Sequence, residues 1–317
     1  MTAILNVRGL EKTFGSLVAA HNINVAVPPL QTVGIIGANG AGKTTFVNMI
    51  TGHLRPTKGS IWFEDQDITG RPSRDITRLG IARSFQVPQI FASLTVLENI
   101  CAATAVARTA GGLIHQALTP LHSSSILADS EFALELFRIA DYRHALAATL
   151  PQGVRKLLDI AMAIAGAPRV VLLDEPTSGI SIEEKFDAMA VVMTALKDRR
   201  ITVLFVEHDM DIVERYADRV LAFYDGTVIA DGPPVATLEN PRIQELISGP
   251  KLLISGRAIS ASTLACGVAA SVWAGSVGPE VPGLIGVNSA DPRSCTLTDC
   301  GPAARLAATA SDIGLLA

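Results

Sequence analysis

The chain of 317 residues has few cysteines, no large excess of one charge and no long apolar run at its start. The four cysteines, Cys101, Cys266, Cys295 and Cys300, show neither zinc-site spacing nor a disulfide framework, which indicates a reducing cytoplasm. A net charge of −4 gives no electrostatic argument for nucleic acid or an anionic membrane as a binding partner. The opening stretch MTAILNVRGLEKTFG has no apolar core, so we expect no secretory signal.

The chain does contain a hydrophobic fraction of 49%, which is typical of a folded globular protein. The composition changes near Gly249 and Pro250, and the remainder is rich in Ala, Gly and Ser. Residues 258–279 carry no charge and are long enough to cross a bilayer, but their Ser, Gly and Thr content favours a loosely ordered appendage over a membrane span. We therefore predict a folded domain over residues 1–249 and a poorly ordered appendage over residues 250–317.

A glycine-rich loop carries the strongest chemical signal. The stretch GIIGANGAGKTTF contains the pattern G-x-x-x-x-G-K-T at Gly37, Gly42, Lys43 and Thr44. A buried strand is expected before it, over residues 32–36, and a helix after it, over residues 44–51, which is the context that this pattern needs. Such a loop turns backbone N–H groups toward phosphates, while the lysine binds the β- and γ-phosphates and the hydroxyl can ligate Mg²⁺.

Acidic residues follow two further strands that are expected to be buried. The run VVLLD ends at Asp174, which is placed to hold Mg²⁺ through water, and Glu175 follows it and can polarise an attacking water. The run ITVLFVEHD brings Glu207 and His208 to another strand end, where His208 is a candidate γ-phosphate contact. Two acids at a strand end are common as solvated residues, but together with the glycine loop they favour a phosphate site.

A helix is predicted in the stretch TLPQGVRKLLDIAMAIAGAP, which spans residues 149–168. Pro151 suits the first turn, because its missing N–H would have no helical partner there. Leu157, Ile160, Ala161 and Ile164 recur at helical spacing and are expected to face the core.

Residues 4 to about 248 resemble the ATP-binding subunit of an ABC transporter. The resemblance rests on motifs in the family's order: KTFG with Phe14 as the aromatic that stacks on adenine, GANGAGKT as Walker A, RSFQ with Gln86 as the Q-loop glutamine, VVLLDE as Walker B with its glutamate, and His208 as the switch histidine. The stretches LGIARSFQVPQIFASLTVLENI and GTVIADGPPVATLENPRIQELI are most similar to the ATPases of branched-chain amino acid importers.

The resemblance implies an α/β fold. Its P-loop NTPase core has a parallel sheet, an N-terminal antiparallel β subdomain over residues 4–34 and 59–64, and an inserted helical subdomain over about residues 94–165. The implied cofactors are ATP and Mg²⁺. The implied catalytic residues are Glu175, His208 and Gln86, and the implied metal ligands are Thr44, Gln86 and Asp174. The implied nucleotide contacts are Phe14, Gly37, Asn39, Gly40, Ala41, Gly42, Lys43, Thr44, Thr45, Pro151 and Gly153.

The run LPQGVRK stands where the family has its signature sequence, usually LSGGQ, whose helix faces the γ-phosphate bound by a second subunit. Gly153 keeps the close-approach backbone. Pro151 replaces the serine whose hydroxyl bond to the phosphate is worth about 1.5–3 kcal/mol, and Val154 replaces a polar side chain. Ser181 stands where the family often has Asp or Asn, which also affects the expected contact across the dimer.

The implied function is ATP hydrolysis that powers a membrane importer, of branched-chain or related amino acids. The implied partners are a second copy or a homologous ATPase in a head-to-tail dimer, integral membrane permeases and, indirectly, a substrate-binding protein, so the expected location is peripheral, on the cytoplasmic face of the membrane. One alternative is the ATPase of a lipid or polysaccharide exporter. Another is a non-transport ABC ATPase acting on ribosomes or DNA, but the sequence lacks the second ATPase domain, long coiled-coil insert or basic patches which that class predicts.

Overall fold

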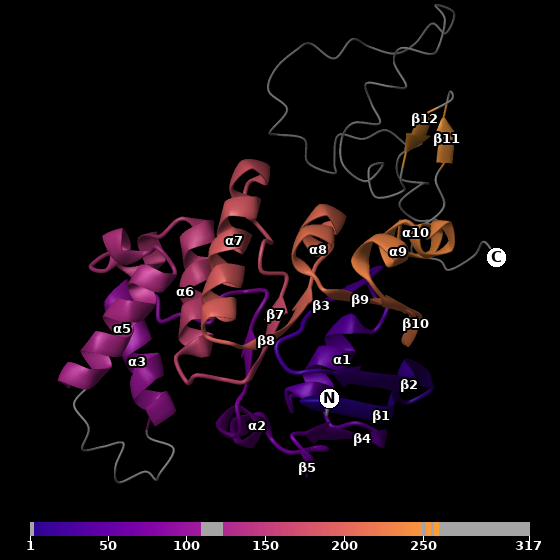
Figure 1. Ribbon diagram of the computed structural model, residues 1–317, viewed down its shortest axis with the longest axis horizontal. Coiled ribbons are helices and arrows are strands. Elements are labelled where there is room, and N and C mark those ends of the chain that lie inside the picture. Colours follow the sequence, from indigo (N-terminus) through magenta and orange to yellow (C-terminus); the bar gives the residue numbers. More distant parts are fainter. Residues whose placement is uncertain (1–2, 109–122, 249–251, 255–256, 260–317) are drawn as a thin grey trace, which may run out of the picture. The chain divides into compact units, whose positions relative to one another are not determined.

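The computed structural model describes residues 3–108, 123–248, 252–254 and 257–259, and most of its strands belong to two β-sheets (Figure 1). The larger sheet has the order β10–β9–β3–β8–β7–β6, and the smaller antiparallel sheet has the order β2–β1–β4–β5. Strands β3, β6, β7, β8 and β9 run parallel, whereas β10 is antiparallel to β9. The architecture confirms the predicted α/β fold with an N-terminal antiparallel subdomain.

The strands have the following bounds: β1 Leu5–Phe14, β2 Leu17–Val27, β3 Thr32–Gly37, β4 Lys58–Phe63, β5 Gln66–Asp67, β6 Ile81–Ser84, β7 Val170–Asp174, β8 Thr202–Val206, β9 Arg219–Tyr224 and β10 Thr227–Gly232. Two further strands, β11 (Leu252–Ile254) and β12 (Arg257–Ile259), pair with each other. Apart from these, the predicted appendage over residues 250–317 lies outside the described residues.

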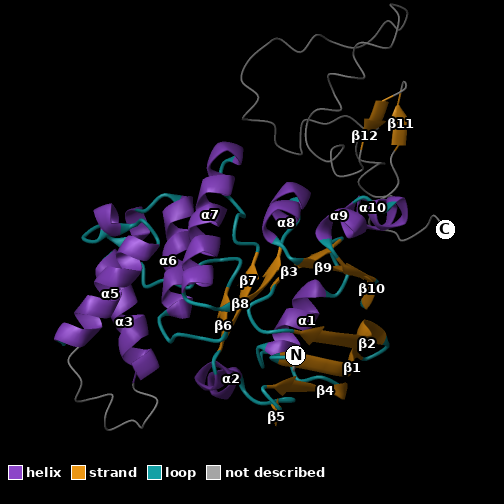
Figure 2. Ribbon diagram, viewed as in Figure 1, coloured by secondary structure: helices purple, strands orange, loops and turns teal. Residues whose placement is uncertain are grey.

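The helices have the following bounds: α1 Lys43–Ile50, α2 Ser73–Leu79, α3 Val96–Arg108, α5 Ser124–Leu136, α6 Gln152–Ile164, α7 Ile182–Asp198, α8 Met210–Tyr216, α9 Pro234–Leu238 and α10 Pro241–Ser248, with short 3₁₀ turns η1 Ala140–Tyr142 and η2 Ala147–Thr149. Helices α3, α5 and α6 form the helical subdomain beside the large sheet (Figure 2). Among the described residues, no helix is both long enough and apolar enough to cross a membrane. The uncharged run over residues 258–279 lies almost wholly outside them.

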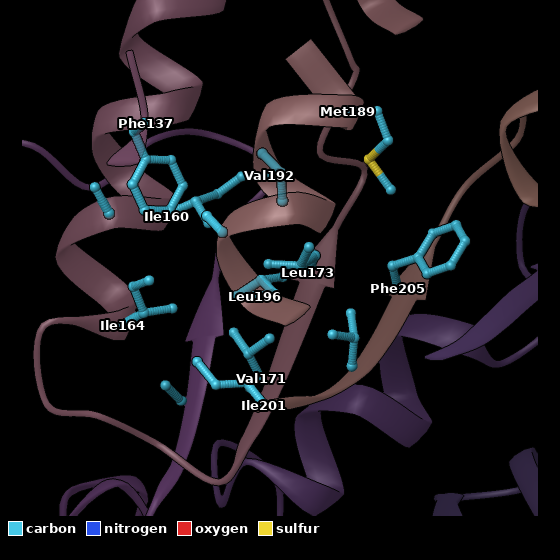
Figure 3. Close-up of a cluster of buried hydrophobic side chains, with 14 of the residues drawn as sticks. Phe137, Ile160, Ile164, Val171, Leu173, Met189, Val192, Leu196, Ile201 and Phe205 are labelled. Atoms are coloured by element: carbon cyan, nitrogen blue, oxygen red, sulfur yellow. The ribbon is translucent and has the colours of Figure 1, made fainter. Parts of the chain in front are cut away.

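The large sheet separates two hydrophobic cores, because successive side chains of a strand point to opposite faces. On one face, Val171 and Leu173 of β7 pack in a core with α5, α6 and α7 (Figure 3). On the other face, Val170 and Leu172 of the same strand pack in a core with α1 and the antiparallel sheet. Strands β7 and β8 in the middle of the sheet are therefore buried along their whole length, and acidic residues stand at their carboxyl ends: Asp174 ends β7 and Glu207 follows β8.

Candidate nucleotide site

The glycine loop follows β3 and leads into α1, as the sequence pattern predicts. Gly37 and Gly42 have positive φ angles of 153° and 97°. A Cβ atom on Gly37 would lie 2.4 Å from the carbonyl oxygen of Phe223, and one on Gly42 would lie 2.8 Å from that of Ala19. Both glycines are therefore required by the close approach of neighbouring backbone. Gly42 caps α1 without a side-chain hydrogen bond, so the first N–H groups of the helix remain available to an anion.

Lys43 is buried at the first position of α1, and its ammonium group turns back over the loop. Its Nζ atom donates hydrogen bonds to the carbonyl oxygens of Gly37 (2.7 Å) and Ala38 (2.9 Å). Burial lowers the pKa of Lys43, and the nearby carboxylates of Glu175 and Asp174 oppose this change. The lysine thus lies between the glycine loop and the acidic end of β7.

Three residues predicted for catalysis meet at the carboxylate of Glu175. Gln86 follows β6, and its Nε2 atom donates to Oε2 of Glu175 at 2.8 Å. His208 follows β8, and its Nε2 atom lies 3.1 Å from Oε1 of Glu175. Each carboxylate oxygen therefore has one side-chain partner, and the partners come from the ends of the strands on both sides of β7.

The backbone of Glu175 is unusual, because its φ angle is +47° in a residue that carries a side chain. Such a conformation costs about 1–3 kcal/mol and persists only where the surroundings hold it. The Glu175 N–H donates to the carbonyl of Val206 at 3.0 Å, and its own carbonyl accepts from the Ser178 N–H at 3.1 Å and from the Lys156 ammonium at 3.1 Å. These three contacts hold the left-handed backbone of Glu175 in place.

Asp174, the last residue of β7, is buried and pairs with an arginine. The Arg83 guanidinium on β6 donates to Asp174 Oδ2 at 2.7 Å and to Asn48 Oδ1 on α1 at 2.5 Å. The carboxylate predicted to act on a metal is thus neutralised by a neighbouring strand and connected to the first helix.

Glu207 is a further buried acid at the end of β8. One of its oxygens accepts hydrogen bonds from the backbone N–H of Thr177 (2.9 Å) and from the Thr177 hydroxyl (2.7 Å). Burial raises the pKa of Glu207, although these hydrogen bonds oppose the rise. Glu207 therefore ties the segment after Glu175 to the segment that carries His208.

Phe14 ends β1 and is about half exposed, with the Lys12 ammonium 4.9 Å from its ring centroid. Pro151 and Gly153 begin α6, which packs in the core on the opposite face of the sheet from α1. The described contacts of Pro151 and Gly153 are with Arg155 and Ile180, not with the glycine loop of the same chain. Pro151 is the N-cap residue rather than part of the first helical turn, and Arg155 N–H donates to its carbonyl at 3.0 Å.

The family model for ABC transporters matches residues 20–178, half of the chain. A curated relative, the high-affinity branched-chain amino acid transport ATP-binding protein BraF of Pseudomonas aeruginosa, is 35% identical over 243 residues, which cover 76% of this chain and 95% of BraF. This chain belongs to the ABC transporter family. It is an ATPase subunit that binds ATP and hydrolyses it to ADP and phosphate.

Solved structures of ABC cassettes share the fold. The ADP conformation of MJ1267, an ATP-binding cassette of an ABC transporter, superposes with a TM-score of 0.70 at 29% identity and covers 79% of this chain and 100% of that chain. The protein cbiO1 of Clostridium perfringens, part of the transporter complex cbiONQ, superposes with a TM-score of 0.64 at 27% identity and covers 78% of this chain and 99% of that chain.

Three charged residues of this ABC subunit that the sequence analysis missed are Arg83, Lys156 and Asp159. Lys156 and Asp159 lie on α6 among apolar residues, and both are buried. Lys156 stands four residues before Ile160, so the helical periodicity already places it on the buried face. The signal in the sequence that could have revealed Lys156 was a charged residue at a position where the helical periodicity expects an apolar one. Leu157, expected in the core, is only partly buried, whereas Leu158 is fully buried.

Proposed function

We propose that Glu175 polarises the water that attacks the γ-phosphate, and that Gln86 and His208 position its carboxylate. The observation that supports this role is the pair of hydrogen-bond partners, one on each carboxylate oxygen, supplied by the strand ends on both sides of β7. His208 belongs to the same cluster, and it also contacts the γ-phosphate when nucleotide binds. The glycine loop (Gly37, Asn39, Gly40, Ala41, Gly42, Lys43, Thr44 and Thr45) cradles the phosphates, and Phe14 stacks on the adenine.

We further propose that Thr44, Gln86 and Asp174 hold Mg²⁺. Their hydroxyl, amide and carboxylate oxygens are the ligands that this ion prefers, and it is commonly bound by one or two carboxylates together with substrate phosphates. In agreement with such a sparse site, the described residues contain no cluster of three or more His, Cys, Asp or Glu residues able to form a complete protein cage. Bound Mg²⁺ would neutralise charge on the transferred phosphate. Asp174 keeps Oδ1 free of the Arg83 contact, which is made by Oδ2.

The proposed working unit is a head-to-tail dimer, with itself or a homologous ATPase, bound to integral membrane permeases at the cytoplasmic face of the membrane. Two observations support this arrangement: α6 packs on the opposite face of the sheet from α1, and the described contacts of Pro151 and Gly153 are with Arg155 and Ile180 rather than with the glycine loop. The relatedness to BraF favours branched-chain or related amino acids as cargo, delivered by a substrate-binding protein. Export of a lipid or polysaccharide is the alternative.

The variant Glu175→Gln tests the chemical proposal. The amide keeps the size of the side chain but cannot take a proton from water, so turnover should fall by about 100- to 10,000-fold, the usual range of general-base effects. ATP affinity should stay close to that of the wild type, and ATP should favour the closed dimer. Steady-state ATPase rates, ATP titration and gel filtration with ATP measure these quantities. Substantial remaining turnover would remove Glu175 from the proposed role.

The identity of the transported substrate can be tested only with the assembled transporter. The subunit, its permeases and its binding protein, reconstituted in liposomes, should show ATPase activity that rises with leucine, isoleucine or valine on the side of the binding protein. Stimulation by a lipid or polysaccharide on the side of the ATPase, without any binding protein, would instead support the exporter alternative.

A further inference from the structure

Lys156 lies in the first turns of α6 and is completely buried. Its ammonium group donates to three backbone carbonyl oxygens, those of Phe85 (3.2 Å), Gln86 (2.5 Å) and Glu175 (3.1 Å). An ammonium group has three N–H donors and no acceptor, so all of its hydrogen-bonding capacity is used on backbone. Both of the residues that meet at the proposed water site, Gln86 and Glu175, are therefore held through their carbonyl groups by one side chain.

Asp159 stands three residues after Lys156 on the same helix and is also buried. Its carboxylate accepts hydrogen bonds from the backbone N–H groups of Gln89 (2.8 Å, Oδ1) and Phe85 (3.3 Å, Oδ2). Lysine thus binds the carbonyls and aspartate binds the amides of one short segment, residues 85–89. One turn of α6 fixes this segment at both of its ends.

Lys156 and Asp159 carry opposite charges in a buried environment. Burial lowers the pKa of Lys156, and the Asp159 carboxylate opposes this change most strongly. Burial likewise raises the pKa of Asp159, and the hydrogen bond from the Gln89 N–H leads the opposing contributions. Buried ion pairs are frequently no more stabilising than apolar residues of similar volume, so stability alone gives no reason for two buried charges here.

The proposed roles of Glu175 and Gln86 require that the backbone of both residues is held in place. Glu175 has a left-handed backbone conformation that its surroundings must hold, and Lys156 contacts its carbonyl directly. Gln86 has a loop backbone and donates to Glu175 only through its side chain, so its position depends on what fixes residues 85–89. Displacing a catalytic group by about 1 Å can cost about 100-fold in rate.

We propose that Lys156 and Asp159 are positioning residues for hydrolysis. They hold the segment 85–89 and the backbone of Glu175 against the first turns of α6, so that the side chains of Gln86 and Glu175 keep their relative positions. The proposal rests on the roles given above to Gln86 and Glu175. The proposal also connects the start of α6, which carries Pro151 and Gly153, to the proposed water site through the hydrogen bonds of Lys156 and Asp159. A shift of this helix end is then transmitted to Gln86 and Glu175 by the Lys156 and Asp159 contacts.

The first measurement is hydrogen exchange on the intact subunit. In the variant Lys156→Met and in the double variant Lys156→Met/Asp159→Asn, which leaves no unpaired buried charge, amides of the segment 85–89 should exchange at least about tenfold faster. Exchange in β3 should stay unchanged, because the hydrogen bonds described for the two side chains go to residues 85–89 and to Glu175. Lys156→Arg retains the charge and the N–H donors and should keep the segment protected.

The second measurement separates rate from binding. Both Met-containing variants should lose about 10- to 100-fold in kcat, with a nucleotide Kd within about threefold of the wild type, because the described hydrogen bonds of Lys156 and Asp159 go to residues 85–89 and Glu175 rather than to the glycine loop. Lys156→Arg should restore kcat to within about threefold. Arg219→Met is the matched control: it removes an ion pair with Asp231 at the amino-terminal edge of the sheet and should lower the melting temperature without changing kcat.

Faster exchange with an unchanged kcat would overturn the proposal, since the pair would then be structural only. An unchanged segment 85–89, or a kcat loss matched by Arg219→Met, would overturn it as well. Gln86→Ala and Glu175→Gln, measured in parallel, keep the two hypotheses apart. If these two retain full turnover, the roles of Gln86 and Glu175 fail; if they lose turnover while the Lys156 variants do not, only the positioning role fails.

Discussion

Glu207 shows how one buried side chain makes the stability of the site depend on pH. Its carboxyl group is removed from water at the end of β8 and touches the segment after Glu175 through Thr177. Burial raises its pKa in the folded state above the ordinary value of 4.5. The folded protein therefore binds this proton more tightly than the unfolded chain does. Its stabilising contribution is complete below pH 4.5 and is lost as the pH rises through the folded-state pKa.

The variant Glu207→Gln makes this contribution measurable. The unfolding free energy of the wild type relative to the variant should be highest below pH 4.5 and should decline as the pH rises. Urea unfolding of both proteins between about pH 4 and about pH 8 gives the difference, in which the other acids cancel. A difference that does not change with pH, or that rises with it, would contradict the buried-acid interpretation.

At the scale of one element, α6 begins without a side-chain cap. Pro151 is its N-cap residue, is exposed, and has no side-chain oxygen with which to accept from the first N–H groups of the helix. Serine is a favoured N-cap residue and is worth about 0.5–2 kcal/mol over alanine at this position. Proline stabilises by restricting the unfolded chain, by about 0.4–1 kcal/mol. The two contributions oppose each other when serine replaces Pro151.

The pair Pro151→Ser and Pro151→Ala separates these contributions. Both variants lose the rigidity of proline, but only serine gains a cap, so Pro151→Ser should be more stable than Pro151→Ala by about 0.5–2 kcal/mol. The stability of Pro151→Ser should lie close to that of the wild type. Thermal and urea unfolding of the three proteins measures the order. If serine and alanine are equal, the hydroxyl does not cap α6.

The sequence predicted the elements whose signals are local. The glycine pattern located the turn from β3 to α1, and the apolar runs located β7 and β8 with Asp174, Glu175 and His208 after them. Strand β6 was not located, because it has only four residues and carries Arg83 and Ser84 within it. The contacts made by Lys156 and Asp159 join segments about seventy residues apart, so only the fold reveals them.

At the scale of the whole molecule, the helices that carry the two halves of the proposed nucleotide site, α1 and α6, pack on opposite faces of the large sheet. Residues of α1 and the glycine loop belong to one hydrophobic core, and residues of α6 belong to the other. We therefore expect a hydroxyl at position 151 to have two separate effects: it caps its own helix, and in the proposed head-to-tail dimer it contacts the phosphate bound by the second chain. Stability reports the first effect within one chain, whereas turnover reports the second between chains.

Mixed dimers, purified through a different tag on each chain, separate the two effects. A chain with both Lys43→Ala and Pro151→Ser, paired with a wild-type chain, places the serine at the one competent glycine loop. Turnover there, or dimer formation at low ATP, should increase, because a hydrogen bond to the phosphate adds about 1.5–3 kcal/mol. In the matched control the same substitutions are on different chains, so the serine faces the loop without Lys43 and turnover should match a Lys43→Ala/wild-type dimer. Equal turnover in the two arrangements, above that of the dimer without serine in both, would argue against a head-to-tail site. If neither arrangement differs from the dimer without serine, the helix N-terminus and the Gly153 backbone bind the phosphate without a hydroxyl.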